Sequence, residues 1–232
     1  MKKVAILLLA LALPLFGKGL GGGFVLAQHV KLNSEGRDAE YVKTILGRSQ
    51  KIVDGLALKD KDAAKAQDVL YVIANRYFTL NDIHEACDQK VKWAKDSLAS
   101  DERKHVIGCA KVKRDAELYK HHFEFEAALS LYLTPEQVEA VKDGLTYQVV
   151  PKTYQAHLDM IPSLKDEEKA QILAWLKEAR EFAIDASTSK AKHEWFGKYK
   201  GRINNWLSQR GYDLVKEREA WYKRMDAAGI KY

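Results

Sequence analysis

Apolar residues recur three and four places apart along most of this chain, and strand-like alternation is absent. Such spacing puts successive apolar side chains on one face of an α-helix, so the pattern predicts an all-α protein. Residues 28–134 contain no proline, which leaves room for long helices. We expect a first helix over about residues 38–56.

Two long apolar seams follow. The first predicts a helix over about residues 62–97, with seam residues Leu70, Ile73, Tyr77, Leu80, His84, Cys87, Val91 and Ala94. The second predicts a helix over about residues 101–133, with seam residues Cys109, Val112, Ala116, Tyr119, Phe123, Ala127 and Leu131. Facing residues of an antiparallel hairpin keep a constant index sum, and the pairs from Cys87–Cys109 to Ile73–Phe123 share one sum. The two seams therefore predict a long antiparallel helical hairpin.

This register places the two cysteines of the chain, Cys87 and Cys109, opposite each other. A disulfide would close a loop of about 22 residues and stabilise the fold by roughly 3 kcal/mol. The alternative is two free thiols, because cysteine is often buried without bonding and helices often lie too far apart for a disulfide. The sequence leaves both alternatives open.

Shorter helices are expected after residue 133. Thr134 as N-cap, Pro135 at the first helical position and Gln137 in a capping box mark the start of one, which ends near Gly144. Further helices are expected over about residues 151–160, 166–186, 192–209 and 215–227, with residues 187–189 as a linker and cap. Together these elements predict one all-helical domain over residues 28–232, a bundle with a long hairpin and shorter C-terminal helices.

The first 27 residues have the composition of a signal peptide. Two lysines precede the apolar run of residues 4–16, which is too short for a bilayer span of about 20 residues. Val25 and Ala27 fit the small-residue rule for signal peptidase. We expect cleavage after Ala27 and a protein exported to the periplasm or beyond, with no membrane span once the signal is removed.

Charge and motifs exclude several classes of function. The full chain carries a net charge of +6. Loss of the three signal lysines leaves about +3, which is no argument for nucleic-acid binding. No nucleophile motif or phosphate-binding glycine loop is present, so catalytic residues are unknown. Glu117, His121 and Glu124 share one helix face, but no second cluster completes a metal shell, so we expect no metal and no cofactor.

Residues 192–214 are unusually rich in aromatic and basic residues. Phe196, Tyr199, Ile203 and Trp206 follow helical spacing and are expected to face the core. Gly197 and Gly201, one turn apart, each cost about 1 kcal/mol relative to alanine inside a helix. We therefore expect another helix or a ligand to approach the backbone there.

The remaining side chains of this stretch are candidates for carbohydrate binding. Aromatic faces stack on sugar rings, while amide and guanidinium groups donate hydrogen bonds to hydroxyls. The alternative is that these residues serve only packing. The candidate ligand-binding residues are Trp195, Lys198, Arg202, Asn204 and Asn205, together with His193 and, outside this stretch, His122.

Three segments carry a resemblance to a known family: "HFEFEAALS", "LSLYLTPEQVEAVKDGLTYQVVPKTY" and "EEKAQILAWLKEAREFAIDASTSKAKHEWFGKYKGRINNWLSQRGYDL". They resemble a bacterial family, the domain of unknown function numbered 3826. The resemblance implies an exported protein that binds sugar and acts in polysaccharide use, and it implies no catalytic residues. Leu133–Gln137 also resembles the Leu-Thr-x-x-Gln motif of periplasmic Spy/CpxP-like chaperones.

The lead interpretation is thus an exported carbohydrate-binding protein of polysaccharide utilisation. One alternative is a Spy/CpxP-like chaperone or adaptor. Another is a glycan-processing enzyme that uses His122, Glu178, Glu181 or His193. The oligomeric state does not follow from the sequence.

Overall fold

The computed structural model describes residues 29–58 and 62–230, and the expected signal peptide lies outside them. The described residues form eight helices and no strand, so the predicted all-α class is confirmed. The helices are α1 (Ala39–Asp54), α2 (Ala63–Ser97), α3 (Ser100–Ser130), α4 (Pro135–Leu145), α5 (Val149–Met160), α6 (Asp166–Ala183), α7 (Ser189–Gln209) and α8 (Leu214–Ala227).

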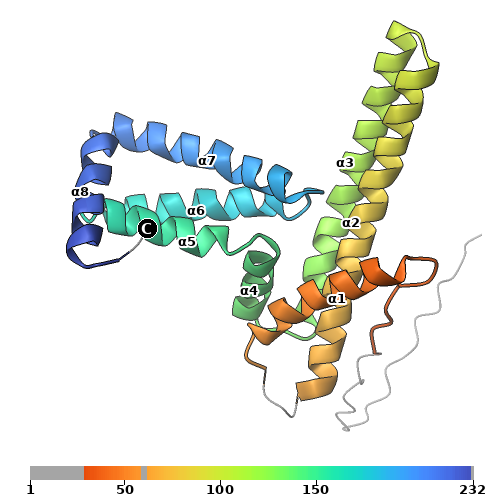
Figure 1. Cartoon of the computed structure of the whole chain (residues 1–232), viewed down its shortest axis with the longest axis horizontal. Coiled ribbons are helices and arrows are strands. Elements are labelled where there is room, and N and C mark those ends of the chain that lie inside the picture. Colours follow the sequence, from red (N-terminus) through yellow and green to blue (C-terminus); the bar gives the residue numbers. More distant parts are fainter. Residues whose placement is uncertain (1–28, 59–61, 231–232) are drawn as a thin grey trace, which may run out of the picture.

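The helices are arranged in two lobes joined through α4 (Figure 1). In the hairpin lobe, α2 and α3 run antiparallel and α1 crosses their base; in the C-terminal lobe, α5, α6 and α7 lie side by side and α8 closes their far end. Each lobe has its own apolar core. Val69, Ile73 and Leu129 belong to the core at the hairpin base, and Ile172 and Ile203 belong to the core of the C-terminal lobe.

Local sequence signals set several helix ends as expected. The Thr134 side chain accepts a hydrogen bond from the Gln137 amide, and the Gln137 side chain accepts one from the Thr134 amide, which confirms the capping box. The close approach of a helix to a glycine occurs at Gly144, where a Cβ would lie 3.1 Å from side-chain carbons of Ile52. A larger residue at position 144 would push α1 away from α4.

The hairpin is present, but the face of α3 predicted to meet α2 is wrong. The α2 seam is correct, since Ile73, Leu80, Cys87 and Ala94 are buried. On α3, however, Val112, Tyr119 and Leu131 of the predicted seam are 70–73% exposed, and Phe123 is 56% exposed. Phe125 and Leu129 are buried instead. Because α3 carries apolar residues on two faces, spacing alone did not determine which face meets α2.

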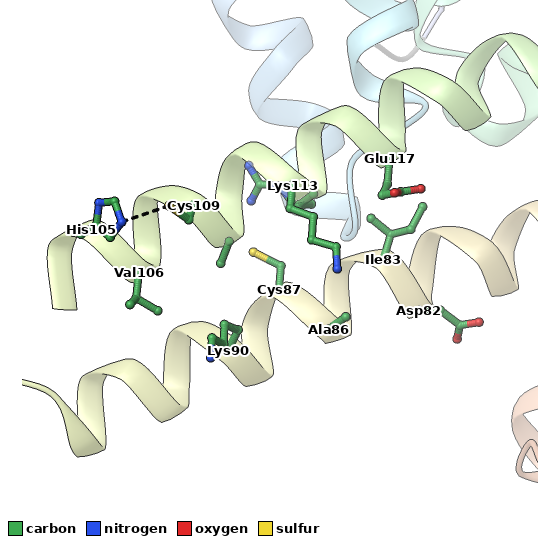
Figure 2. A pocket seen from close by; sticks show the side chains of 12 residues that line it. Asp82, Ile83, Ala86, Cys87, Lys90, His105, Val106, Cys109, Lys113 and Glu117 are labelled. Atoms are coloured by element: carbon green, nitrogen blue, oxygen red, sulfur yellow. Dashed lines mark hydrogen bonds between the residues drawn. The ribbon is translucent and has the colours of Figure 1, made fainter. Parts of the chain in front are cut away.

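Both cysteines are free thiols in the structure, which is the second of the two alternatives stated above. Cys87 is buried and points from α2 toward α3, while Cys109 is exposed beside His105 on α3 (Figure 2). An apolar groove of about 800 Å³ lies between the two helices here. Between residues 81 and 124 only Cys87 and Ala94 are buried, so the outer hairpin has little core of its own.

The buried carboxylate of Glu168 ties the start of α6 to the end of α7. It accepts hydrogen bonds from the Lys165 amide at 2.9 Å, from Arg210 Nε at 2.6 Å and from the Tyr212 hydroxyl. Burial by itself raises the pKa of Glu168, but these donors outweigh it and lower the pKa to about 2 from its ordinary value of 4.5.

The lowered pKa of Glu168 predicts a contribution to acid stability. The folded state holds this carboxylate ionised more strongly than the unfolded chain does, so the contribution is complete above about pH 4.5 and is lost as the pH falls toward 2. Glu168→Gln should be less stable at pH 7 and should lose less on acidification, as measured by urea unfolding at pH 7, 4 and 3. Glu167→Gln, on the exposed neighbour, is the control, and equal acid dependence in all three proteins would contradict this assignment.

Candidate functional site

A large cleft lies between the two lobes. Its volume is about 1210 Å³, and its walls come from α1, α2, α4, the α4–α5 and α6–α7 connections and the start of α7. Its lining combines aromatic rings, amide and hydroxyl groups and charged side chains. Those residues include Tyr41, Tyr77, Tyr147, Asn81, Gln89, Gln148, Ser187, Thr188, Arg48, Lys51, Lys92, Lys192, Glu85 and Asp88.

The α4–α5 connection brings a strained backbone to the edge of this cleft. Tyr147 and Gln148 both have positive φ, 61° and 60°, which is uncommon for residues other than glycine. The Gln148 amide donates to the carbonyl oxygen of Asp143 at 2.8 Å, which closes the end of α4. Each such residue costs of order 1–3 kcal/mol, and strain of this kind clusters at functional sites. Both side chains line the cleft.

Lys192 lies at the inner end of the cleft and is buried. Its Nζ donates to the carbonyl oxygen of Leu145 at 2.9 Å and lies 5.9 Å and 6.0 Å from the ring centroids of Tyr77 and Tyr147. Burial lowers the pKa of Lys192 to about 8, and the positive charges of Arg76 and Arg48 act in the same direction. The cleft thus contains a buried ammonium group between two tyrosine rings.

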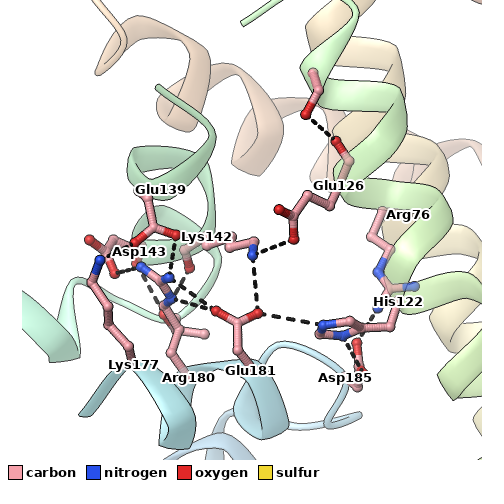
Figure 3. Close-up of polar contacts among 12 residues, drawn as sticks. Arg76, His122, Glu126, Glu139, Lys142, Asp143, Lys177, Arg180, Glu181 and Asp185 are labelled. Atoms are coloured by element: carbon pink, nitrogen blue, oxygen red, sulfur yellow. Dashed lines mark hydrogen bonds and ion pairs between the residues drawn. The ribbon is translucent and has the colours of Figure 1, made fainter. Parts of the chain in front are cut away.

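A network of charged side chains joins the two lobes beside the cleft (Figure 3). Asp185, just beyond α6, pairs with the buried Arg76 of α2 and with His122 Nδ1 of α3 at 2.9 Å, and its backbone oxygen contacts His84 Nε2 at 2.8 Å. Lys142 of α4 binds Glu181 at 3.2 Å. Because these residues come from α2, α3, α4 and α6, the network fixes the walls of the cleft relative to one another.

His122 belongs to this network and not to the predicted binding surface. Its Nε2 lies 3.5 Å from Glu181, and its Nδ1 lies 2.9 Å from Asp185. With both ring nitrogens facing carboxylates of the protein, the imidazole has no free nitrogen directed at a substrate. Among the residues considered for catalysis, His122, Glu178, Glu181 and His193 do not line the cleft.

The structure brings Trp195, Lys198 and Arg202 together on the outer surface of α6 and α7. Trp195 stacks on Phe182 with a centroid distance of 4.7 Å, and Lys198 Nζ lies 4.2 Å from the Trp195 ring centroid. The Arg202 guanidinium lies 4.6 Å from the ring centroid of Trp175. Side chains of the protein therefore already occupy the ring faces on which a sugar would stack.

His193 lies closer to the cleft than the other predicted residues of α7. Its ring stacks on Tyr147 at 5.3 Å, and its Nδ1 lies 2.8 Å from the carbonyl oxygen of Ser189. Asn204 and Asn205 are exposed. The predicted binding residues thus divide into three parts. Trp195, Lys198, Arg202, Asn204 and Asn205 form an α7 surface group. His193 packs against the edge of the cleft, and His122 belongs to the charged network.

Of the two neighbours expected at Gly197 and Gly201, the packing helix is wrong for the described residues. Both glycines are exposed, and a Cβ at either would have no neighbouring atom within 4 Å. The core-facing stripe of α7 is confirmed for Phe196, Tyr199 and Ile203, which are buried on the other side of the helix.

These open positions predict a gain in stability on substitution. Gly197→Ala and Gly201→Ala should each raise the free energy of unfolding by about 0.5–1 kcal/mol, because alanine loses less backbone entropy in a helix and meets no clash here. Thermal melting of the single and double variants tests this. Gly144→Ala is the contrasting variant and should be destabilising, since its Cβ would meet Ile52. Loss of stability at 197 or 201 would show that a neighbour occupies that space.

Sequence reasoning missed the cleft residues Arg48, Tyr77, Tyr147 and Lys192. One signal was present for Lys192, because it precedes Phe196 by four residues and so continues the buried stripe of α7 by one turn. A lysine on a buried stripe is unusual and marks a position with a special environment. No comparable pattern marks the others, since the cleft forms only when α1, α2 and α7 meet.

Neither a metal-binding cluster nor a membrane-spanning helix is found within the described ranges. No group of three or more His, Cys, Asp or Glu side chains within 29–58 and 62–230 is placed to hold a metal ion. Across the same part of the chain, none of the helices combines the length and apolarity that crossing a membrane requires.

Fold and site define an all-helical, two-lobed protein with a polar, aromatic cleft between the lobes. The chain belongs to the family described as protein of unknown function (DUF3826), whose sequence profile matches residues 42–227. The match covers α2 to α8 completely and α1 from residue 42 onward. It therefore includes all or most of each helix that lines the cleft. No curated protein of similar sequence was found.

Proposed function

We propose that the protein is an exported carbohydrate-binding protein and that the cleft between the lobes is its binding site. The observation that carries the proposal is the lining of the cleft, in which three tyrosine rings stand among amide, hydroxyl and charged groups. Tyrosine faces pack on the apolar faces of sugar rings, and the polar groups hydrogen-bond to hydroxyls. A volume of about 1210 Å³ accommodates an oligosaccharide of several residues.

Other features support this location and the export. Tyr147 and Gln148 hold their strained conformation at the edge of the cleft, while the charged network fixes the lobes, so the site is organised before a ligand binds. The α7 surface group has its aromatic faces covered by Phe182, Lys198 and Arg202. The composition of residues 1–27 is that of a signal peptide, which supports a role outside the cytoplasm.

The experiment is a glycan array followed by calorimetric titration of the oligosaccharides that bind. Tyr147→Asn removes the ring, and asparagine tolerates the positive φ of this position, so binding should weaken at least tenfold while the fold persists. Trp195→Ala, on the α7 surface, should leave affinity unchanged. If Trp195→Ala weakened binding and Tyr147→Asn did not, the site would lie on α7. The absence of any glycan ligand would overturn the proposal.

A further inference from the structure

The charges inside the cleft are unbalanced. Lys192 is only 6% exposed, and its one hydrogen bond is to a neutral backbone carbonyl. It forms no salt bridge with any carboxylate among the described residues. A buried ammonium ion without a counter-charge is costly, and proteins usually pair such a group or give it a ligand.

The surrounding charges do not supply the missing partner. Asp185 attracts Lys192, but its carboxylate already pairs with Arg76 and with His122. Arg48 of α1 lines the same cleft, and its positive charge disfavours the protonated form of Lys192. Glu85 and Asp88 of α2 also line the cleft, but neither forms an ion pair with Lys192. Two cations of the cleft, from α1 and α7, therefore act on each other while Asp185 is engaged elsewhere.

We infer that the cleft binds an acidic saccharide, whose negative group pairs with Lys192 and Arg48 between the rings of Tyr77 and Tyr147. This inference rests on the proposed function and names its ligand class. A carboxylate of a hexuronic acid and a sulfate ester share the required chemistry, because each offers several acceptor oxygens to a buried ammonium and a guanidinium. The tyrosine rings then pack against the sugar that carries the charge.

Binding should depend on pH in a way that neutral sugars do not show. Lys192 must be protonated to pair with the anion, and its pKa in the free protein is about 8. Affinity for an acidic saccharide should be constant below about pH 7 and fall up to tenfold per pH unit above about pH 8. The charged and titratable groups around Lys192 are Arg48 of α1, Arg76, Tyr77 and His84 of α2, Tyr147 before α5 and Asp185 after α6. The cleft lining adds Tyr41 and Lys51 of α1 and Glu85, Asp88 and Lys92 of α2.

Arginine side chains do not titrate in this pH range, and burial raises the pKa of Tyr77 above its ordinary value of 10.0. The fall in affinity is therefore expected to report Lys192. Lys192→Met should abolish it, and a fall that persists in that variant would contradict the assignment.

The test compares oligogalacturonates with neutral galacto-oligosaccharides of equal length, and adds sulfated galacto-oligosaccharides, by calorimetric titration of the protein. We expect at least tenfold tighter binding of an acidic series than of the neutral one. The tighter of the two acidic series identifies the carboxylate or the sulfate ester as the natural group. Inorganic sulfate alone, at the same concentration, should compete only weakly, because it lacks the sugar ring.

Variants separate this inference from the proposed function. Lys192→Met should reduce affinity for the acidic series at least tenfold, and Arg48→Met should reduce it less, while Lys200→Met on the exposed side of α7 should have no effect. Lys192→Met should melt no lower than the wild type, because it removes a buried charge that lacks a partner. Equal binding of neutral and acidic sugars, unaffected by Lys192→Met, would overturn the inference and leave the proposed function standing. If no saccharide of any series binds, both are wrong.

Discussion

Arg180→Ala should destabilise the protein by about 3–5 kcal/mol, which is a large part of the stability of a typical domain. Arg180 is 1% exposed on α6. Its guanidinium binds Asp143 at 2.8 Å, Glu139 at 2.6 Å and Glu181 at 3.0 Å. Removing it leaves three carboxylates close together with a cavity among them, so like-charge repulsion adds to the lost hydrogen bonds.

Urea unfolding of Arg180→Ala at pH 7 measures this loss. The matched control is Arg202→Ala on α7, whose guanidinium is 54% exposed and lies 3.6 Å from Glu178, and which should cost less than about 1 kcal/mol. Acidification should narrow the gap in stability between wild type and Arg180→Ala, because the pKa of Glu139 is lowered in the folded wild type and the stabilisation it reflects is lost as the pH falls. A loss at pH 7 as small as that of the control would show that the network does not join α4 to α6.

Phe125→Ala should cost about 3–5 kcal/mol, whereas Phe123→Ala should cost less than about 0.5 kcal/mol. Phe125 is 6% exposed in the core at the hairpin base, with the Arg76 guanidinium 5.4 Å from its ring centroid. Truncation there leaves a cavity that its neighbours fill only in part. Phe123 is 56% exposed and touches mainly the rings of Tyr119 and His122 on its own helix.

This pair of variants tests which face of α3 packs inward, since the two phenylalanines are two residues apart and lie on different faces of the helix. Unfolding in urea gives both values from one kind of measurement. If Phe123→Ala proved the more damaging change, α3 would have to pack on α2 through the seam that includes Tyr119 and Phe123.

Much of the local structure was predictable from the sequence. The expected ranges 62–97 and 215–227 agree with α2 and α8 within a residue at each end, and the expected range 192–209 ends with α7 but begins three residues late. The Thr134–Gln137 capping box also appears as expected. These features depend on interactions between residues three or four apart, which the sequence contains in full.

The candidate site was less predictable, because its residues are far apart in the sequence. Four different segments supply Arg48, Tyr77, Tyr147 and Lys192, and none of these residues lies in a recognised binding motif. The aromatic and basic residues of 192–214 were conspicuous by composition, yet Trp195, Lys198 and Arg202 mostly cover one another. The composition of this segment identified an aromatic and basic surface but not the neighbouring cleft.

The sequence by itself determined that this protein is helical, where most helices begin and end, and that α2 and α3 form a hairpin. The helical class and the helix ends follow from hydrogen bonds and side-chain spacing within single helices, and the hairpin follows from two long apolar seams joined by a short connection. Tertiary structure decided which face of α3 turns inward, that Gly144 and not Gly197 meets another helix, and that Lys192 is enclosed between Tyr77 and Tyr147. Burial is set by whichever neighbour packs on a helix, and those neighbours come from distant segments of the chain.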